Sequence, residues 1–132
     1  ASLGNATHFG DLIKERKTNG GGTSNSVRGV VGGGTYPGND DGVSFIEFVT
    51  LASEGNATEF GNLTANSSYA AAVGSQTRAV FSGGSRNDAN SNIIDFIEIA
   101  TGGNAQDFGD IAGTSVFYNN GLSDCHGGLG GY

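Results

Sequence analysis

Asp124, Cys125 and His126 are consecutive residues that bring together a carboxylate, a thiol and an imidazole. A Cys/His pair can act as a nucleophile with its general base, and both side chains are zinc ligands. Neighbouring residues of a strand point to opposite faces, however, so Cys125 and His126 would not meet. The chain has 1 Cys and 2 His, too few for a zinc site of its own. We therefore expect these residues to be variant strand positions.

Glu47 and Glu98 are a second candidate pair, since each follows a Phe-Ile dipeptide. Two carboxylates can act as general acid and general base, but the members of such a pair have unequal environments. Glu47 and Glu98 stand at equivalent places in two copies of one pattern, which favours a shared structural role near the edge or rim of a sheet. The sequence therefore predicts no catalytic residue, and the chain is not expected to be an enzyme.

Two further sets of polar residues could bind a cation or another ligand. The stretch 39–42, Asn-Asp-Asp-Gly, lacks the alternating oxygen ligands and the distal Glu of an EF-hand loop, so a solvated hairpin tip is predicted. Asp11, Asn62 and Asp110 each follow a Gly at equivalent positions, and Asx side chains at turns bond the nearby backbone. We expect no metal ion and no cofactor at these positions.

Four Asn-x-Ser/Thr sequons stand at Asn5, Asn56, Asn62 and Asn66. They would suit N-glycosylation of a surface protein in a suitable host, and they would have no meaning in a bacteriophage or a cytosolic protein. Two of them arise from the repeated Asn-Ala-Thr. Both interpretations stay open at the level of the sequence.

The composition argues against two classes of partner. The net charge is −7, from 13 acidic and 6 basic residues, whereas proteins that bind a nucleic-acid backbone carry a basic face. No segment approaches the roughly 18 apolar residues of a membrane-spanning helix, and the N-terminus has no signal-peptide pattern. We expect neither nucleic acid nor a membrane as partner. The 25 Gly and the many Ser, Thr and Asn favour short strands and tight turns over helices.

A nine-residue motif, Gly-Asn-Ala-x-x-Phe-Gly-Asx-Leu/Ile, organises the chain. Its three copies begin at Gly4, Gly55 and Gly103, so that the spacings are 51 and 48 residues. Such a period is typical of repeat architectures, in which each unit packs on the next. Each copy is predicted to form a turn, a short strand with one core Phe, and a second turn.

Three more strand segments separate the motif copies, so that one repeat has four short strands. The first contains Tyr or Ala, the second begins near an Arg and ends in a glycine cluster, and the third contains Phe-Ile-Glu. The glycines imply close approach of another backbone. The segments are 67–73 and 114–118, 27–34 and 77–84, and 44–49 and 95–100, with polar loops at 35–42 and 85–92 and a basic surface loop or edge strand at 13–26.

The domain division follows from these strands. Residues 1–12 are predicted to be the last strand of a partial repeat, 13–63 and 64–111 two complete repeats, and 112–132 the first strands of a further partial repeat. The six recurring phenylalanines are expected in the core: Phe45, Phe48, Phe60, Phe81, Phe96 and Phe108.

The pattern resembles kelch repeats, whose propeller blades have four strands and a double glycine, here at 32–34 and 83–84. With Phe-Ile-Glu and the Gly-Asn-Ala motif in the same order, nearly the whole chain is similar to kelch-like repeat proteins in virions of tailed bacteriophages, especially those of marine bacteria. It departs from ordinary kelch blades in having no Trp. The resemblance implies an all-β fold of β-propeller blade repeats and a virion structural protein, such as a tail, fibre, nozzle or capsid-decoration component.

Two complete repeats would not close a propeller, which needs about four to eight blades. Three explanations are open: a part of a longer propeller, a ring or filament of several copies, or a non-propeller stack of sheets. Each predicts contact with copies of the chain or with other virion proteins, and a location in the virion. The alternative is a secreted or cell-surface adhesin or carbohydrate-binding module, whose rim loops bind host-surface glycans.

Overall fold

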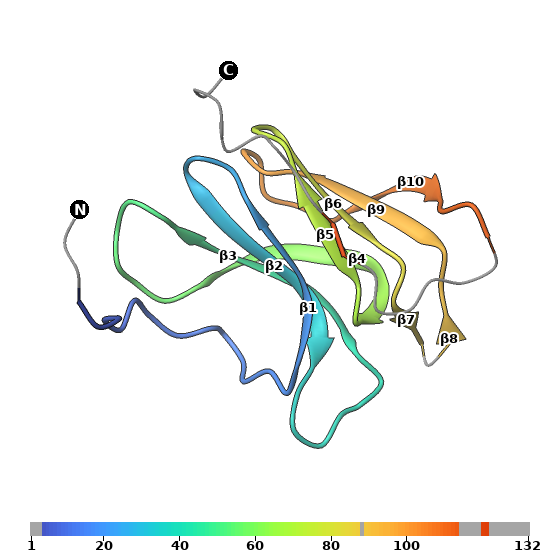
Figure 1. Cartoon of the computed structure of the whole chain (residues 1–132), viewed down its shortest axis with the longest axis horizontal. Coiled ribbons are helices and arrows are strands. Elements are labelled where there is room, and N and C mark those ends of the chain that lie inside the picture. Colours follow the sequence, from blue (N-terminus) through green and yellow to red (C-terminus); the bar gives the residue numbers. More distant parts are fainter. Residues whose placement is uncertain (1–3, 88, 114–119, 122–132) are drawn as a thin grey trace.

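The regular structure of the chain consists of β-strands in two antiparallel sheets. The computed structural model describes residues 4–87, 89–113 and 120–121, and in these residues it has ten strands and no helix (Figure 1). The first sheet has the order β1-β2-β3-β4-β7-β8 and the second the order β10-β9-β6-β5. The predicted all-β fold is confirmed. The described part of the chain therefore offers no helix that could cross a lipid bilayer.

Most strands lie on the predicted segments, but residues 4–12, which were predicted to hold the last strand of a partial repeat, form no strand. The first sheet comprises β1 (Thr18–Ser24), β2 (Arg28–Thr35), β3 (Val43–Thr50), β4 (Thr58–Ser68), β7 (Ser85–Arg86) and β8 (Ala89–Asn90). The second sheet comprises β5 (Ala71–Gly74), β6 (Arg78–Ser82), β9 (Ile93–Glu98) and β10 (Gln106–Asp110). The predicted loop at 85–92 instead contains the short strands β7 and β8, which extend the first sheet.

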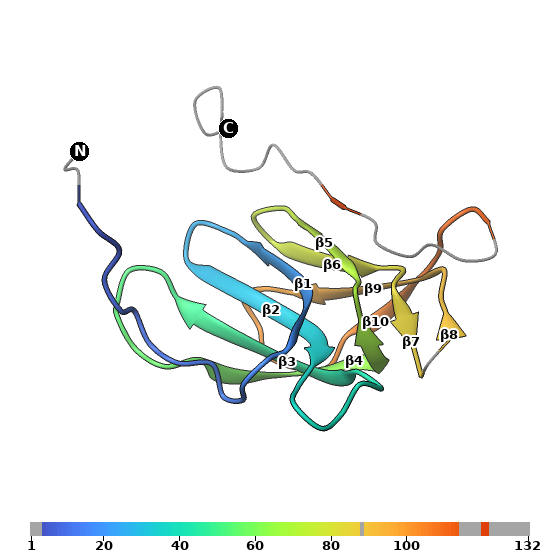
Figure 2. The ribbon, with the colours of Figure 1, turned by 60° about the horizontal axis from the view of Figure 1, so that its bottom comes forward.

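Two four-stranded meanders, β1-β2-β3-β4 and β5-β6-β9-β10, share one topology and one register. Arg28 of β2 pairs with Thr50 of β3, and Arg78 of β6 pairs with Glu98 of β9. The two meanders stack as layers, and the curled first sheet brings β7 and β8 next to the second sheet (Figure 2). The basic segment contains the edge strand β1, as the sequence suggested.

Strand β4 connects the two layers. Its beginning pairs with β3, while Ser67 and Ser68 at its end pair with β7. The predicted strand 67–73 is interrupted, because Tyr69 has a φ of 58° and turns the chain before β5 begins at Ala71. The glycine clusters lie against this end of β4. A Cβ on Gly33 would lie 2.6 Å from Ser67 O, which confirms the expected close approach of two backbones.

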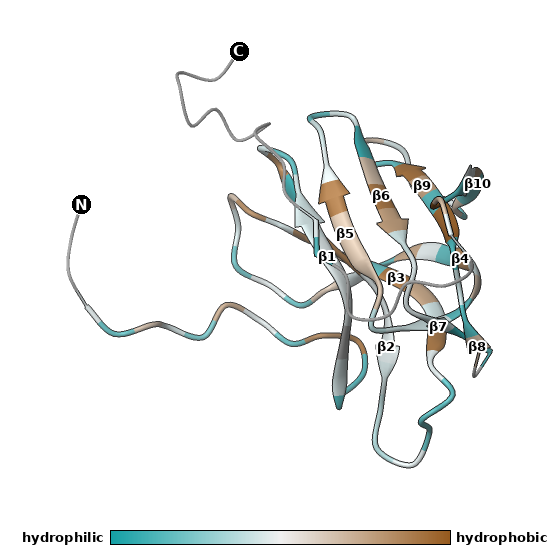
Figure 3. Ribbon diagram, turned by 45° about the vertical axis from the view of Figure 1, so that its right-hand side comes forward, coloured by the Kyte–Doolittle hydropathy of each residue, from teal (hydrophilic) through white to brown (hydrophobic). Residues whose placement is uncertain are grey.

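The core lies between the two sheets. The first sheet contributes Val30, Ile46, Phe60 and Leu63, and the second contributes Ala79, Phe81 and Ile97, with Ile99 just after β9. Apolar residues lie along β5, β6 and β9 (Figure 3). Of the predicted core phenylalanines, Phe60 and Phe81 are buried, and Phe45, Phe48 and Phe96 are half-buried. The core prediction is wrong for Phe108, which is 61% exposed, since neither sheet of the described residues covers it.

Candidate assembly interface

Consecutive copies of the Gly-Asn-Ala motif bind each other through the backbone, and we call this contact a motif junction. In the first junction the Gly55 N–H donates to Phe9 O at 2.9 Å, and the Ala57 N–H donates to Asp11 O at 2.8 Å. The Asn56 side chain completes the contact, because its Oδ1 accepts the Asp11 N–H at 2.9 Å. The Gly-Asn-Ala part of the second copy thus holds the Phe-Gly-Asp part of the first.

The second junction repeats the first, group for group. The Gly103 N–H donates to Phe60 O at 2.8 Å, and the Ala105 N–H donates to Asn62 O at 2.7 Å. Asn104 Oδ1 accepts the Asn62 N–H at 3.0 Å. The motif is therefore a device that joins one repeat to the next, and the Asn of Gly-Asn is its specific polar group. Sequence reasoning missed that Asn, although its presence in all three copies was the available signal.

A glycine lies at each junction because the two backbones approach closely. A Cβ on Gly10 would lie 2.1 Å from Gly55 O, and a Cβ on Gly61 would lie 2.1 Å from Gly103 O. No side chain fits at such a distance, so both junctions require glycine. The third equivalent, Gly109, has no atom within 4 Å of the corresponding position. Among the described residues, no segment occupies its junction surface.

Arg28 joins the two sheets through a contact that is separate from the motif junctions. The Arg28 guanidinium lies 4.6 Å over the Phe48 ring, and Phe48 meets Phe60 edge-on with a centroid distance of 6.0 Å. Arg28 Nη1 donates to Ile99 O at 2.7 Å and to Ala100 O at 3.2 Å. The first sheet thus binds backbone carbonyls that follow β9 of the second sheet.

The second sheet carries the same stack on its outer side. The Arg78 guanidinium lies 5.0 Å over Phe96, and Phe96 meets Phe108 edge-on at 5.9 Å. Arg78 Nε donates to Glu98 Oε1 at 2.6 Å instead of to another sheet. The three side chains reproduce the inner stack of the first sheet on a surface that faces solvent.

The two sheets therefore stack in the same sense, face to back. The side that faces inward in the first sheet faces outward in the second: Phe60 is 6% exposed, whereas its equivalent Phe108 is 61% exposed. The other side behaves in the opposite way, since Ile99 is fully buried and its equivalent Leu51 is 45% exposed. A sandwich with a two-fold relation would bury like sides together, and this arrangement does not.

The buried carboxylate of Asp95 binds residues of the first sheet. Asp95 Oδ2 accepts Arg86 Nη1 at 2.7 Å, and Asp95 also accepts the N–H and the Oγ1 hydroxyl of Thr64 at 3.1 and 2.7 Å. The side chains of Arg86 and Asp95 are 3% and 0% exposed. Because Arg86 and Thr64 belong to the first sheet and Asp95 to the second, this cluster joins the sheets. Breaking a buried pair by removing one partner is costly.

The matching carboxylate of the first sheet is Glu47. It accepts the Ile13 N–H at 2.7 Å and Arg16 Nε at 2.9 Å, and its side chain is 1% exposed. The side chain of Arg16, which precedes the predicted edge strand β1, is therefore buried rather than part of the surface.

The predicted equivalence of Glu47 and Glu98 is wrong. Glu47 pairs with Glu59 across β3 and β4, and Asp95 pairs with Asp107 across β9 and β10. Glu47 thus matches Asp95, and it lies in the middle of a sheet rather than at a rim. Glu98 is an exposed residue at the end of β9. Both buried carboxylates are held by arginine and backbone donors, which is a structural arrangement.

The acidic loop forms a hairpin tip. Tyr36 and Asn39 form a bridge, and Asn39 Oδ1 accepts the Asp41 N–H at 2.9 Å. Asp40 accepts Lys17 Nζ at 2.8 Å, and this hydrogen bond raises the pKa of Lys17. No group of three or more His, Cys, Asp or Glu that could hold a metal ion occurs in residues 4–87, 89–113 and 120–121.

The four sequons differ in their surroundings. Asn5 and Asn66 are exposed. Asn56 is exposed but its side chain is engaged at a motif junction, and Asn62 is half-buried, with its Oδ1 accepting the Ser44 hydroxyl at 3.2 Å. A glycan on either of the last two would compete with these contacts.

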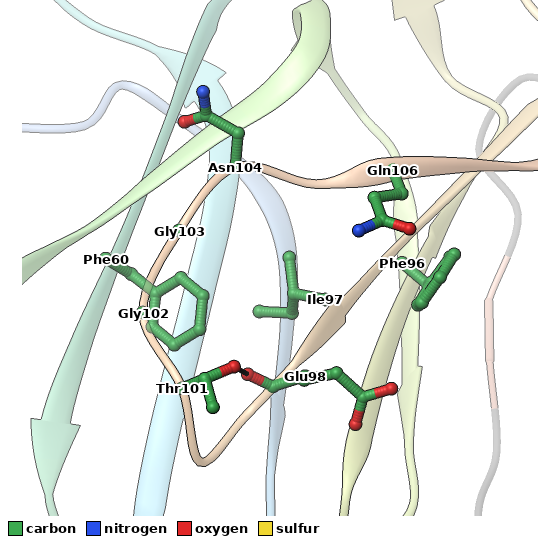
Figure 4. A pocket seen from close by; sticks show the side chains of 9 residues that line it. All are labelled: Phe60, Phe96, Ile97, Glu98, Thr101, Gly102, Gly103, Asn104 and Gln106. Carbon is green, nitrogen blue, oxygen red and sulfur yellow. Dashed lines mark hydrogen bonds between the residues drawn. The ribbon is translucent and has the colours of Figure 1, made fainter.

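A hollow of about 270 Å³ lies beside the second junction (Figure 4). Phe60 and Phe96 flank Ile97, and Glu98 and Gln106 carry polar groups at its edge. The hollow combines two rings with a carboxylate and amides, which are groups that can contact a small polar ligand.

Asp124, Cys125 and His126 lie outside the described residues, as does most of the predicted partial repeat 112–132. No family model matches the sequence, and no curated protein matches it.

Proposed function

We propose that this chain is a structural assembly protein that works through protein–protein contacts. The observation that carries the proposal is the face-to-back stacking of the two sheets. A face-to-back interface leaves one unpaired copy of each of its two sides at the ends of the stack. Leu51 is exposed on one end and Phe108 on the other. Each is the equivalent of a side chain that the other sheet of the chain buries, so we expect a further protein surface to cover it.

The stacked meanders suit a larger ring or filament built from the same unit. Four-stranded meanders that pack face to back are the design of propeller blades, so we propose blade repeats as the finer description of the fold. The kelch-like resemblance favours a virion component, such as a tail, fibre, nozzle or capsid-decoration protein, among assembling proteins. Its partners are then copies of itself or neighbouring virion proteins.

Sedimentation of the whole chain tests this proposal, with electron microscopy of the same sample. We expect discrete rings or filaments whose proportion rises with protein concentration. A monomer at every concentration examined would overturn the proposal.

A carbohydrate-binding adhesin is the second candidate, and the hollow beside the second junction is the observation that favours it. Its two rings and its polar edge could receive a sugar. Saturable binding to host-surface glycans that is lost on Gln106→Ala, with assembly intact, would support it.

A further inference from the structure

We propose that a second copy of this chain binds the outer side of the second sheet, and that residues 108–110 of one copy replace residues 9–11 at the first junction of the other. This inference rests on the proposed assembly function and names its contact surfaces. The product is a head-to-tail interface that repeats the interface already present inside each chain.

The third motif copy presents the groups that a junction requires. Phe60 O, the Asn62 N–H and Asn62 O are the groups bound at the second junction. Phe108 and Asp110 hold the same positions on β10 that Phe60 and Asn62 hold on β4. The 132 residues contain three Gly-Asn-Ala segments, and in this proposal a second copy of the chain supplies the segment that binds the third motif copy.

The outer stack fits the same partner surface. Inside the chain, Arg28 donates to the carbonyls of Ile99 and Ala100. Leu51 in the first sheet is equivalent to Ile99 in the second. Each directly follows the residue that pairs with the arginine, because Arg28 pairs with Thr50 and Arg78 pairs with Glu98. In the assembly, Arg78 would leave Glu98 and donate to the carbonyls at Leu51 and the next residue of the second copy.

One segment occupies the docking position, namely residues 4–13 of the second copy. This segment is a copy of the motif that would replace it, and its apolar side chains are poorly covered: Phe9, Leu12 and Ile13 are 38%, 43% and 47% exposed. Their equivalents in the second copy of the motif include Phe60 and Leu63, at 6% and 4% exposed. Replacement keeps the backbone hydrogen bonds of the junction, but release of the segment would break the hydrogen bond from the Ile13 N–H to Glu47.

The exchange is favoured because it buries additional apolar side chains. Docking would cover the exposed ring of Phe108 and the exposed side chain of Leu51, and burial of apolar side chains stabilises association. The contact surfaces differ on the two copies, so the interface is heterologous and can continue into a ring or a filament. The released residues 4–13 would remain outside the new interface.

Two matched variants test the exchange, with sedimentation under reducing conditions as the readout. Phe108→Asp removes a docking ring that is exposed in the monomer, and we expect its apparent dissociation constant to rise by more than tenfold. Phe9→Asp changes the equivalent ring of the displaced segment, and we expect association to be unchanged or tighter. Equal weakening by both variants would overturn the exchange. Unchanged circular dichroism of the monomers serves as the control for folding.

A third variant separates exchange from simple addition, in which Gly4-Asn5-Ala6 of a second copy would bind residues 108–110 without displacement. Asn5→Ala should leave assembly unchanged under exchange and should abolish it under addition. Amide hydrogen exchange gives a second readout, because Asp11 should lose protection on assembly while Ala57 keeps it. Assembly that Phe108→Asp leaves intact would overturn this inference alone, whereas a wild-type monomer at all concentrations would overturn the proposed function as well.

Discussion

Glu47 on β3 and Asp95 on β9 hold the same position in their two meanders, and each carboxylate is buried against an arginine. Asp95 binds Arg86 and Thr64 of the neighbouring sheet, and Glu47 binds the segment that precedes β1. Two carboxylates thus play the same part at two levels of the stack. Asp95 fixes the preceding sheet, and Glu47 fixes the chain segment that precedes the first sheet.

The first prediction concerns this cluster. Asp95→Ala should lower the free energy of unfolding by about 3–5 kcal/mol, because Arg86 would be left buried without its partner. Urea denaturation measures the loss. Glu98→Ala is the matched control, since the Arg78–Glu98 pair is 51% and 44% exposed and should contribute no more than about 1 kcal/mol. Similar losses in the two variants would contradict a structural role for the buried pair.

The all-β class and most strand segments could be predicted from the sequence, but the alignment of the two meanders could not be taken from identical letters. Phe-Ile-Glu ends at Glu47 in one copy and at Glu98 in the other. The structure matches Glu47 with Asp95, because strand register is fixed by the turn that leads to the next motif. Both Glu47 and Asp95 precede their next Gly-Asn by 8 residues, and that constant spacing was the better guide.

The partners of the buried carboxylates could not be predicted. Arg16 and Arg86 are single residues in polar stretches, and nothing in their spacing distinguishes them from solvated surface charges. They become buried because chain segments fold back across a sheet, which depends on tertiary packing. The function of the motif as a junction was equally hidden, since its hydrogen bonds join residues 45 positions apart.

The second prediction concerns the glycines of the junctions. Gly61→Ala should lower stability by about 1–3 kcal/mol more than Gly109→Ala, because a Cβ on Gly61 would lie 2.1 Å from Gly103 O. The two glycines have φ values of 159° and 139°, so backbone strain enters both variants and largely cancels in the comparison. Thermal unfolding of the monomers measures the difference. A larger loss for Gly109→Ala would show that strain, not close approach, selects glycine.

The third prediction concerns the arginine that joins the sheets. Arg28→Met keeps an apolar stem over Phe48 but removes the hydrogen bonds to the carbonyls of Ile99 and Ala100, and it should cost about 1–3 kcal/mol. Arg78→Met is the control, because its hydrogen bond joins two exposed side chains, and its cost should stay below about 1 kcal/mol. Denaturant unfolding under dilute conditions compares them. In a concentration-dependent assembly assay the order of the two effects should reverse. There Arg78→Met should weaken assembly more than Arg28→Met does.

The last prediction compares equivalent rings on the inner and outer sides of the stack. Phe60→Ala should destabilise the chain by about 3–5 kcal/mol, because Phe60 is 6% exposed and its removal leaves a cavity between the sheets. Phe108→Ala should cost less than about 1.5 kcal/mol, since it loses mainly an edge-on contact with Phe96. Urea unfolding at low protein concentration gives both values. At high concentration an assembled wild type gains stability from its interface, so the apparent cost of Phe108→Ala should grow with concentration. The cost of Phe60→Ala reflects packing within one chain and should not change with protein concentration. If only the cost of Phe60→Ala changed with concentration, the ring of Phe108 would not be part of an interface.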